Sequence, residues 1–369
     1  MQITRLWLTD FRSYHTLELP LDAGLTAIVG PNGVGKTNVL EALGLLATLK
    51  SFRSAPVDSL VRHGAEKGFV RAEGIRDERE VLIELELAKG KTRAQVNRQR
   101  LRRARDLLGA VRVTVFAPDD LALVKEGPAR RREYLDDALV ALDPAADGVV
   151  SDLERVLRQR NALLRQCHGR LDEGAAMTMD VWDTKLASVG EELTKRREAL
   201  VAALLPHLSS AYEVLAGRCV PVTAVYQRSW PETTLAEALA AGRNDDVRRG
   251  VTQRGPHRDE LVLQIDGLAS RSEASQGEQR TLALALRLSS HRLISQRLGE
   301  APLLLLDDVL SELDPDRSRA LLANLPPGQA VITSASPLPP DAHADQQLHV
   351  HPDGTFQPKP VDDAAGGVS

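Results

Sequence analysis

The sequence predicts an α/β fold in which a mixed sheet carries a phosphate-binding site and a helical lobe is inserted into the chain. Three observations lead to this prediction. A glycine-rich loop at 30–37 follows a short β-branched run, an apolar run at 303–306 ends in two aspartates, and residues 147–206 show heptad spacing. Residues 68–75 and 79–88 are expected to be antiparallel strands, because the second alternates apolar and charged side chains. The sheet is therefore expected to be mixed, with an antiparallel β-subdomain.

The loop at 30–37 fits the phosphate-binding pattern G-x-x-x-x-G-K-[ST] at every fixed position. Its residues, all expected to contact a nucleotide, are Gly30, Pro31, Asn32, Gly33, Val34, Gly35, Lys36 and Thr37. A buried strand at 25–29 precedes the loop, and a helix from about Thr37 to Leu49, with apolar residues at helical spacing, follows it. The alternative, a glycine-rich turn before an ordinary helix, is disfavoured by this context. A strand, a glycine turn and a helix N-terminus aim N–H groups at one anion. Lys36 is expected to reach the β- and γ-phosphates, and the Thr37 hydroxyl to bind Mg²⁺.

The second half of this site is expected after the apolar strand at 303–306. Such a strand carries a carboxylate to the C-terminal edge of a parallel sheet, where α/β sheets bind ligands. Asp307 is expected to hold the Mg²⁺ shell, and Asp308 to orient or deprotonate the attacking water. The predicted catalytic residues are thus Lys36, Asp307 and Asp308, and the predicted metal ligands are Thr37 and Asp307. A strand that merely ends in two solvated aspartates is the alternative, which the phosphate loop disfavours.

A short polar segment before a leucine-rich helix offers a further anion site. Ser275, Gln276 and Gly277 stand at the expected start of a helix over 275–291. A serine and a glycine at such a terminus can hold an anion through backbone N–H groups. The alternative is a plain capping box, in which Ser275 caps the helix and Glu278 reaches back. Both interpretations can hold together.

Composition limits the classes of function. Aromatic residues make up only 3% of the chain, which argues against a wall of stacked aromatics for single-stranded nucleic acid. No apolar run approaches the ~20 residues of a membrane span, and no signal peptide opens the chain. Cys167 and Cys219 lack metal-ligand spacing and indicate a reducing compartment. We therefore expect a cytoplasmic protein with no membrane association.

The formal net charge of −4 means that any contact with DNA must use a local basic patch. The most basic stretch, 89–105, contains no acidic residue. Its candidate DNA contacts are Arg98, Arg100, Arg102, Arg103 and Arg105. The alternative for this stretch is a solvated hairpin. Arg130–Arg132 is a second candidate, but acidic residues within the next two helical turns offer it ion pairs.

Residues 147–206 are expected to form two antiparallel helices packed as a short coiled-coil hairpin of roughly 35 Å. The first seam is Leu153, Leu157, Arg160, Leu164, Cys167 and Leu171, and the second is Trp182, Leu186, Val189, Leu193, Arg196, Leu200 and Leu204. Gly169 and Gly174 bracket the expected turn, and Pro206 is expected to stop the second helix. Cys167 is then a small apolar core residue rather than a reactive thiol.

Several motifs resemble those of the ABC-type ATPases and, within them, the RecF family of bacterial recombination mediators. Ser275, Gly277 and Gln279 match the signature motif, and Ser311–Asp314 matches the D-loop. The motifs that resemble the RecF family itself are Asp10–Tyr14, Val115–Leu121, Leu135–Asp136, Gly255–Asp259 and Leu305–Asp314. The match runs from the first strand to about residue 335. The resemblance implies an ABC-type P-loop ATPase head, of the kind found in DNA-repair and chromosome-structuring proteins.

The resemblance also implies ATP and Mg²⁺ as cofactors and a head-to-tail, ATP-dependent homodimer. Ser275, Gln276 and Gly277 of one subunit would close over the phosphate loop of the other, and Asp314 would communicate across the interface. It further implies binding to double-stranded DNA and to single-strand/double-strand junctions during recombinational repair of gapped or stalled replication DNA. There, RecR and RecO would act with it to load RecA. Slow, weak, DNA-stimulated hydrolysis would open the dimer, as suits a switch rather than a motor.

Three departures from the ABC pattern point toward weak turnover. Ala117 stands where a Q-loop glutamine is normal, and Asp308 stands where many such ATPases have glutamate. Thr333 and Ser334 stand where a switch histidine would follow the strand at 329–333. The residue that replaces the missing metal ligand or the missing γ-phosphate sensor is not evident from the sequence.

The resemblance divides the chain into a head and a helical lobe. The predicted segments are the head at 1–125 and 250–369, the helical lobe at 126–249 with its hairpin near 150–206, the signature helix at 275–291 packing with that lobe, and a disordered tail at 360–369. The residue types in the polar turn at 252–259 do not by themselves indicate a function for it.

Three alternatives remain beside the ATP-gated DNA clamp. A chromosome-structuring head would carry long coiled coils, whereas the hairpin at 153–204 is short. The ATPase subunit of a transporter would need a membrane partner and would normally show the Q-loop glutamine and the switch histidine. A small-molecule phosphotransferase would need an acceptor site, which the sequence does not show. We therefore favour the clamp.

Overall fold

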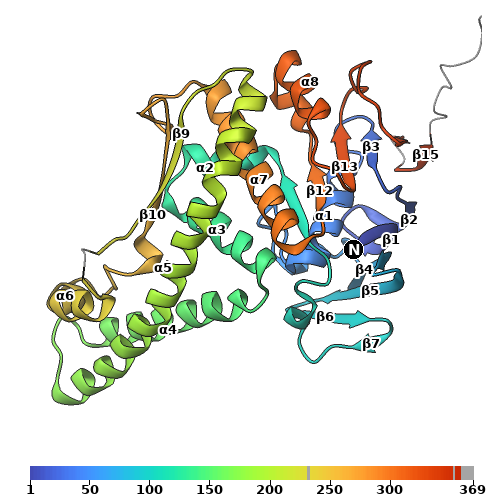
Figure 1. Cartoon of the computed structure of the whole chain (residues 1–369). Coiled ribbons are helices and arrows are strands. Elements are labelled where there is room, and N and C mark those ends of the chain that lie inside the picture. Colours follow the sequence, from blue (N-terminus) through green and yellow to red (C-terminus); the bar gives the residue numbers. More distant parts are fainter. Residues whose placement is uncertain (231–232, 352–353, 359–369) are drawn as a thin grey trace, which may run out of the picture. The chain divides into compact units, whose positions relative to one another are not determined.

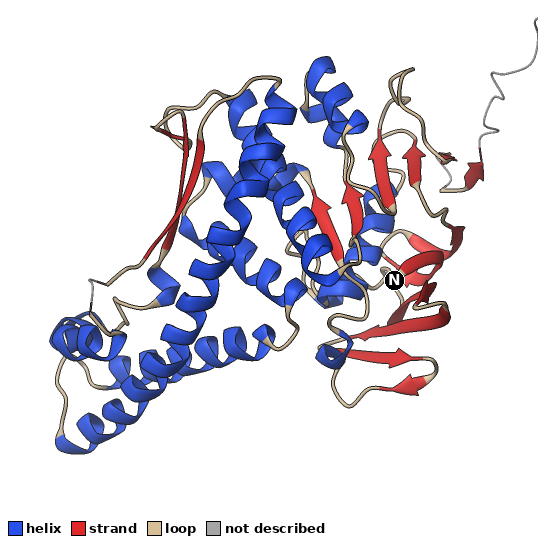
Figure 2. Cartoon of the chain, in the orientation of Figure 1, coloured by secondary structure: helices blue, strands red, loops and turns tan. Residues whose placement is uncertain are grey.

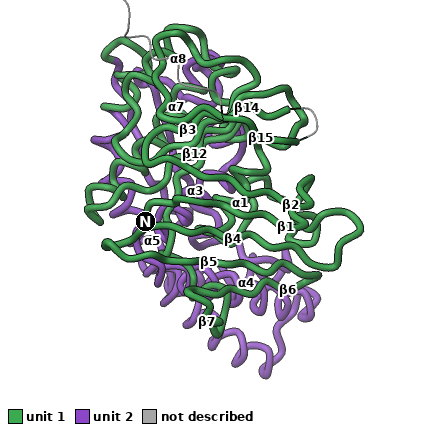
Figure 3. Tube along the Cα trace, turned by 90° about the vertical axis from the view of Figure 1, so that its right-hand side faces the viewer, with its two compact units in different colours: residues 1–121, 210–219, 280–369 green, residues 122–209, 220–279 purple. Residues whose placement is uncertain are grey.

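The computed structural model describes residues 1–230, 233–351 and 354–358, which form two compact units (Figure 3). Unit 1 comprises Met1–Leu121, Ser210–Cys219 and the described residues from Arg280 onward. Unit 2 comprises Ala122–Ser209 and Val220–Gln279.

The mixed sheet of unit 1 positions the phosphate loop. Its strand order is β15-β14-β3-β13-β12-β8, and only β15 runs antiparallel to its neighbour (Figure 1). The strands are β3 (Leu25–Val29), β8 (Val113–Phe116), β12 (Leu303–Leu306), β13 (Ala330–Ser334), β14 (Gln346–Val350) and β15 (Phe356–Pro358). All residues of β12 and β13 are buried, as expected of central strands that are covered on both faces. The prediction of a mixed α/β sheet is confirmed.

The antiparallel sheet of unit 1 has the order β2-β1-β4-β5-β6-β7. Its strands are β1 (Gln2–Phe11), β2 (Tyr14–Pro20), β4 (Lys67–Arg76), β5 (Arg79–Ala88), β6 (Lys91–Val96) and β7 (Gln99–Arg100), and Figure 2 shows them in red. The predicted strands at 68–75 and 79–88 pair with each other in register, for example Val70 with Leu85. Buried side chains of both sheets and of α1 (Lys36–Thr48) form one apolar core. The antiparallel β-subdomain is thus confirmed.

Helices complete the two units. The further helical segments of unit 1 are η1 (Val57–Ser59), η2 (Ala104–Leu107), η3 (Pro118–Leu121), η5 (Val309–Glu312) and α8 (Pro315–Ala323), and α7 (Gln276–Leu298) begins in unit 2 and continues into unit 1. The helices of unit 2 are α2 (Ala122–Lys125), α3 (Pro128–Leu142), α4 (Ala146–Gln166), α6 (Leu235–Arg249), η4 (Pro256–Arg258) and most of α5 (Glu173–Ala216). A small sheet, β9 (Val222–Gln227), β10 (Glu260–Ile265) and β11 (Leu268–Ala269), belongs to unit 2.

The helical hairpin of unit 2 is formed by α4 and α5, which are joined by a turn at 167–172 (Figure 1). Arg160 of α4 is completely buried, and its guanidinium donates to Asp183 of α5 and to Asp246 of α6, at 2.7 Å each. A third helix therefore shares the polar core of the hairpin. The predicted charged member of the first seam, Arg160, thus lies in the core, whereas its neighbour Leu157 is only half-buried.

Two details of the predicted hairpin are wrong. Pro206 lies inside α5, which continues to Ala216. An interior proline costs about 3 kcal/mol, but burial of Leu204, Leu208 and the residues beyond it along the same helix outweighs that cost. In the second seam, the buried arginine is Arg197, at 2% exposed, rather than Arg196. α5 is also, among the described residues, the one helix long and apolar enough to cross a membrane, a test that core helices of soluble proteins also pass.

The compact units do not coincide with the predicted lobes along the whole chain. The boundary at Leu121 lies close to the predicted one at residue 125, but residues 250–279 pack in unit 2 rather than in unit 1. The compact units are defined by packing, whereas the predicted lobes follow the resemblance to the ATPase family. The lobe boundaries therefore remain a prediction. The predicted disordered tail at 360–369 lies outside the described residues.

Candidate nucleotide-binding site

The phosphate loop connects β3 to α1 at the carboxyl end of the parallel strands. Gly33 and Gly35 adopt φ angles of 86° and 105°, a backbone region that favours glycine. A Cβ on Gly35 would lie 2.7 Å from the Tyr14 hydroxyl and 3.0 Å from Ser13 Oγ. The β1–β2 turn therefore presses directly against the loop and leaves no room for a side chain there.

Lys36 is the first residue of α1 and folds back over the loop. Its ammonium group donates to the carbonyl oxygens of Gly30 and Pro31, at 2.7 Å each. Burial lowers the pKa of Lys36, and the nearby carboxylates of Asp308 and Asp307 oppose that shift. The lysine is therefore held at the mouth of the loop by two neutral acceptors, which an anionic phosphate can replace at a gain in electrostatic energy.

Thr37 and Asp307 lie together although 270 positions separate them in the sequence. The Thr37 hydroxyl donates to Asp307 Oδ1 at 2.8 Å, and Asp307 is 5% exposed. Burial raises the pKa of Asp307 despite these hydrogen bonds. A hydroxyl and one carboxylate are the oxygen ligands that a phosphate-bound Mg²⁺ uses, with waters and phosphates as the others. The chemistry of the pair therefore fits this kind of metal site. Among the described residues, no group of three or more His, Cys, Asp or Glu side chains is arranged to hold a metal ion.

Thr333 is a residue of this site whose contacts were not predicted. From the sequence, Thr333 is visible only as a residue that stands where a switch histidine is usual. Its hydroxyl donates to Asp307 Oδ1 at 2.8 Å and accepts from the backbone N–H of Asp308 at 2.9 Å. The only signal for this contact in the sequence is a polar residue near the end of an apolar strand. The structure adds that this strand, β13, lies next to β12 in the sheet. Thr333 therefore fixes both aspartates.

Asp308 follows at a φ of 49° and begins the η5 turn. It is half-buried, and its charge favours the protonated form of Lys36. The structure thus brings together all three predicted catalytic residues in unit 1. The role of Asp308 as a general base remains a prediction.

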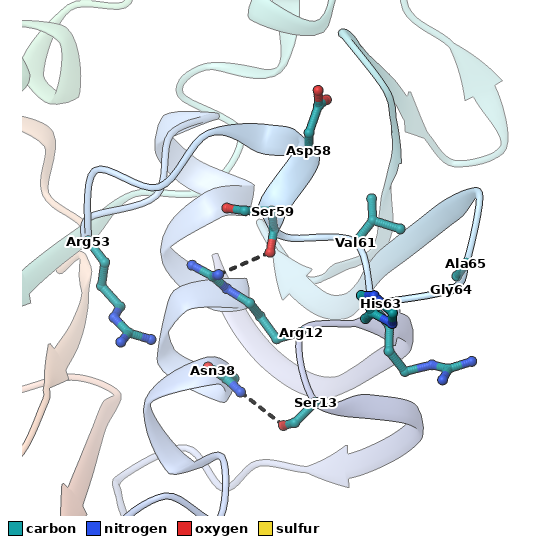
Figure 4. A pocket seen from close by; sticks show the side chains of 11 residues that line it. Arg12, Ser13, Asn38, Arg53, Asp58, Ser59, Val61, His63, Gly64 and Ala65 are labelled. Carbon is teal, nitrogen blue, oxygen red and sulfur yellow. Dashed lines mark hydrogen bonds between the residues drawn. The ribbon is translucent and has the colours of Figure 1, made fainter.

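A polar pocket of about 580 Å³ lies beside the loop and contains Ser13 and Asn38, which are hydrogen-bonded at 2.9 Å (Figure 4). Arg12, Arg53, Arg62 and His63 also line it. The carboxylate of Asp58 lines it as well. Polar groups next to a phosphate loop can hydrogen-bond the ribose and base of a nucleotide. The sequence motif containing Arg12 was recognised, but this pocket was not predicted.

Arg12 is held by a buried carboxylate under the pocket. Its Nε and Nη2 donate to Glu41 of α1 at 2.7 and 2.6 Å, and Glu41 is completely buried. Glu41 also accepts from Ser51 Oγ, which in turn accepts from the backbone N–H of Arg53 at 3.1 Å. One carboxylate therefore orients two arginine-bearing segments around the pocket.

The predicted signature segment caps α7. The Ser275 hydroxyl accepts from the N–H of Glu278 at 3.3 Å, and Glu278 accepts from the N–H of Ser275 at 2.9 Å. The capping box is thus confirmed, and Ser275 and Gln276 remain exposed. These residues belong to unit 2, whereas the phosphate loop belongs to unit 1. Their contact with a nucleotide remains a prediction.

Asp314 and the D-loop lie in unit 1. Asp314 caps α8 by accepting from the N–H of Arg317 at 2.9 Å, and Glu312 pairs with Arg280 of α7 at 2.6 Å. The D-loop is thus anchored to the signature helix in the same chain. A role for Asp314 across a dimer interface remains a prediction.

The basic stretch forms the β6–β7 hairpin and the segment after it. Arg98, Arg100, Arg102 and Arg105 are exposed, and the described residues show no ion pair for them. Arg103 pairs with Asp106 at 3.4 Å, and Arg93 pairs with Glu86. Exposed, mostly uncompensated cations favour the interpretation as a polyanion contact.

The second basic candidate, Arg130–Arg132, is compensated within unit 2. Arg130 pairs with Glu126 and Glu133, and Arg131 pairs with Glu260 at 2.7 Å. Arg132 donates to the carbonyl oxygen of Asp259. The predicted internal pairing is thus confirmed, although most of the partners differ from those expected.

The turn at 252–259 forms a buried polar network. Asp259 is completely buried and accepts from the Tyr226 hydroxyl at 2.6 Å and from the N–H of Ser229 at 2.8 Å. Arg197 of α5 donates to the Pro256 carbonyl at 2.9 Å. Burial raises the pKa of Asp259. These bonds tie the turn to β9 and α5, so its residues have a clear structural role.

Comparison with known proteins agrees with this geometry. Residues 2–331 match the RecF/RecN/SMC N-terminal domain family. The DNA replication and repair protein RecF of Streptomyces avermitilis is 47% identical to this chain, and the match covers 91% of this chain and 94% of the relative. The protein of the same name from Frankia alni is 44% identical, and the match covers 91% of this chain and 93% of the relative. A solved structure of the recombination mediator protein RecF with ATP, in the RecFOR pathway, has a TM-score of 0.88 at 29% identity and covers 97% of each chain. A chromosome-structuring Smc head has a TM-score of 0.57 at 19% identity, which shows the shared fold.

The mixed sheet, the phosphate loop and the paired Thr37 and Asp307 define an ABC-type P-loop ATPase head with a helical insert. The sequence relatives narrow this class. The chain belongs to the RecF family of DNA replication and repair proteins. The predicted resemblance is thus confirmed.

Proposed function

We propose that this chain is an ATP-dependent DNA-binding switch of recombinational repair. The observation that carries the proposal is the contact of Thr37 with Asp307, at 2.8 Å, beside the buried Lys36. The segments that follow β3 and β12 are distant in sequence. Together they place the ammonium group of Lys36, the hydroxyl of Thr37 and the carboxylate of Asp307 at the end of one sheet. The ATP-bound relative and the family name support ATP as the ligand and DNA repair as the setting.

In this proposal, Lys36 exchanges the carbonyls of Gly30 and Pro31 for the β- and γ-phosphates of ATP. Thr37 and Asp307 hold Mg²⁺, which supplies charge neutralisation at the phosphates. Asp308 orients or deprotonates the attacking water. Thr333 keeps Asp307 in the orientation that faces Thr37.

The pocket beside the loop would take the nucleoside half of ATP. Asn38 and Ser13 line the side next to the loop, and Arg53 contributes positive charge from the segment after α1. Arg12 already makes three hydrogen bonds, two to Glu41 and one to the Ser59 carbonyl, so we assign it to shaping this pocket.

ATP would bring two chains together head to tail. The exposed Ser275 and Gln276, with Gly277, would close over the phosphate loop of the second chain, and Asp314 would lie at the interface. The dimer would bind duplex DNA or single-strand/double-strand junctions in the cytoplasm, partly through the basic hairpin. It would act with RecR and RecO to load RecA on gapped DNA, and slow hydrolysis would release it.

Sizing the protein with ATP, with ADP and without nucleotide, each with and without gapped duplex, tests this proposal. We expect a dimer only with ATP, and a larger complex when duplex is added. Lys36→Met should abolish both changes while the protein remains folded. Dimerisation and DNA binding that persist in Lys36→Met would contradict the proposal.

A further inference from the structure

An ion pair joins the beginning of α7 to the turn that follows the candidate base. Arg280 Nη2 lies 2.6 Å from Glu312 Oε2, and Nη1 of the same guanidinium donates to the backbone carbonyl of Glu312 at 3.2 Å. An ordinary surface ion pair holds two side chains only and contributes little to stability. Here one guanidinium holds both the side chain and the backbone of the same residue. We call this contact the Arg280–Glu312 clamp.

The first end of the clamp is attached to the signature segment, residues 275–279. The capping box described above closes the start of α7. Gln279 is 5% exposed, and its side-chain amide donates to the carbonyl oxygens of Ser270 and Arg271 at 2.9 and 3.1 Å. The chain before the helix is therefore bound to the first turn of α7, and Arg280 is the next residue of that helix. A displacement of the signature segment is thus passed to Arg280.

The second end of the clamp is attached to the candidate base. Glu312 is the last residue of η5, and Asp308 caps the start of this turn. The Asp308 carbonyl accepts from the Ser311 hydroxyl at 2.8 Å and from the Ser311 N–H at 3.3 Å. Asp308 also has a φ of 49°, in a backbone region that is strained for residues other than glycine and that clusters at switch positions. A shift of Glu312 therefore acts on a turn that holds Asp308 in a strained conformation.

We infer that the Arg280–Glu312 clamp couples the two nucleotide sites of the dimer, so that ATP held by the partner's phosphate loop positions Asp308 in the chain's own site. This inference rests on the head-to-tail dimer proposed above. In that dimer the signature segment of each chain faces the partner's phosphates, and α7 and the clamp connect it to the η5 turn of its own chain. Each site then hydrolyses ATP at the full rate only when the other site is occupied. Because such coupling is reciprocal for binding, the second ATP also binds more tightly than the first.

Mixed dimers of full-length chains test the coupling. A reporting chain is mixed with an excess of the Asp308→Asn chain, which is expected to bind ATP without hydrolysing it, and turnover is measured at saturating ATP on duplex DNA. Ser275→Ala or Arg280→Met in the reporting chain should each slow its hydrolysis about fivefold. The phosphate loop of that chain and the signature segment of its partner are unchanged in both cases. The double variant should be no slower than either single variant, because both changes interrupt one connection.

The control variants separate positioning from folding. Arg319→Met removes an exposed ion pair with Asp316 in α8, makes the same change in net charge as Arg280→Met, and should leave the rate unchanged. Arg280→Lys keeps the charge and one donor, and should restore part of the rate. Binding of a fluorescent ATP analogue should be the same in all these reporting chains. Glu312→Gln, which keeps the shape of the side chain, repeats the test if thermal unfolding shows that Arg280→Met does not fold.

The outcomes distinguish the clamp from the proposed function. A double variant slowed by the product of the two single effects would overturn the inference, and so would full-rate hydrolysis by both Arg280→Met and Glu312→Gln. If the unmodified chain dimerises with ATP, either of these results counts against the clamp alone. If sizing shows no ATP-dependent dimer of the unmodified chain, the proposed function and the clamp are both wrong.

Discussion

The hydroxyl of Thr333 lies 2.8 Å from Asp307 Oδ1 and also accepts the backbone N–H of Asp308 at 2.9 Å. One residue of β13 therefore orients both the carboxylate that we propose as a Mg²⁺ ligand and the peptide group of the candidate base. Thr333 stands where a switch histidine is usual in ABC-type ATPases, and these two hydrogen bonds give it a structural role at both aspartates.

Thr333→Val should slow ATP hydrolysis about tenfold, because a loss of about 1.4 kcal/mol in positioning energy corresponds to that factor. ATP binding should change little, since Lys36 and the loop amides remain. The matched control is Thr26→Val, which removes a partly buried hydrogen bond to Gln346 in the same sheet without touching Asp307. Single-turnover hydrolysis with separate binding measurements distinguishes the two. Equal slowing in both variants would contradict a positioning role.

Asp308→Asn should trap an ATP-bound dimer on DNA, because an amide cannot take the proton of the attacking water. We expect a long-lived dimer on gapped duplex and hydrolysis reduced by about a hundredfold or more. Dimer lifetime on DNA, followed by light scattering after removal of free ATP, measures the effect. An unaltered lifetime would assign the base to another residue.

Glu41→Ala should destabilise the protein by about 3 kcal/mol, because it leaves the Arg12 guanidinium without its bidentate partner in a largely buried setting. Nucleotide binding should weaken as well, since Ser51 and the Arg53 segment lose their anchor. Glu84→Ala, which removes an ion pair with the half-exposed Arg71, should cost at most about 1 kcal/mol. Urea unfolding compares the two variants.

Stability should fall as the pH decreases from about 6.5 to about 4. Burial lowers the pKa of His291 from 6.5 to about 4, so in this window the unfolded chain binds a proton that the folded chain does not. The contribution of His291 is thus fully present above pH 6.5 and is lost progressively below it, by about 3 kcal/mol at most. His257 shows the same shift for the same main cause.

His291→Leu should therefore remove about half of the pH dependence that these two histidines produce. Thermal unfolding across this pH range measures the slopes. Parallel curves for His291→Leu and the unmodified protein would show that His291 charges freely in the folded state.

Charge reversal at Arg100, Arg102 and Arg103 should weaken duplex binding and flatten its salt dependence, because fewer counterions are released. Reversal at the exposed Arg170, Arg248 and Arg249 of unit 2 makes the same change in net charge and serves as the control. Titrations at several salt concentrations give the slopes. If the salt dependence of DNA binding is unchanged in the hairpin variant, this stretch is an ordinary solvated hairpin and does not contact DNA.

The sequence by itself determined the phosphate loop, the strand before Asp307 and Asp308, the antiparallel strand pair and the family. These features depend on local patterns: fixed glycines, a lysine at a helix start and apolar alternation, which hold wherever the segment lies. The capping box at Ser275 is of the same kind, because all its bonds lie within four residues.

Only the tertiary structure decided which distant residues complete the site. The contacts of Asp307 with Thr333, and of Arg12 with Glu41, join segments whose spacing carries no signal. The same holds for Pro206, because local propensity predicts a helix end there, whereas burial of the residues beyond it keeps α5 continuous. Burial energy acts on the assembled core, and a single sequence shows the residues available for that core but not how they are paired.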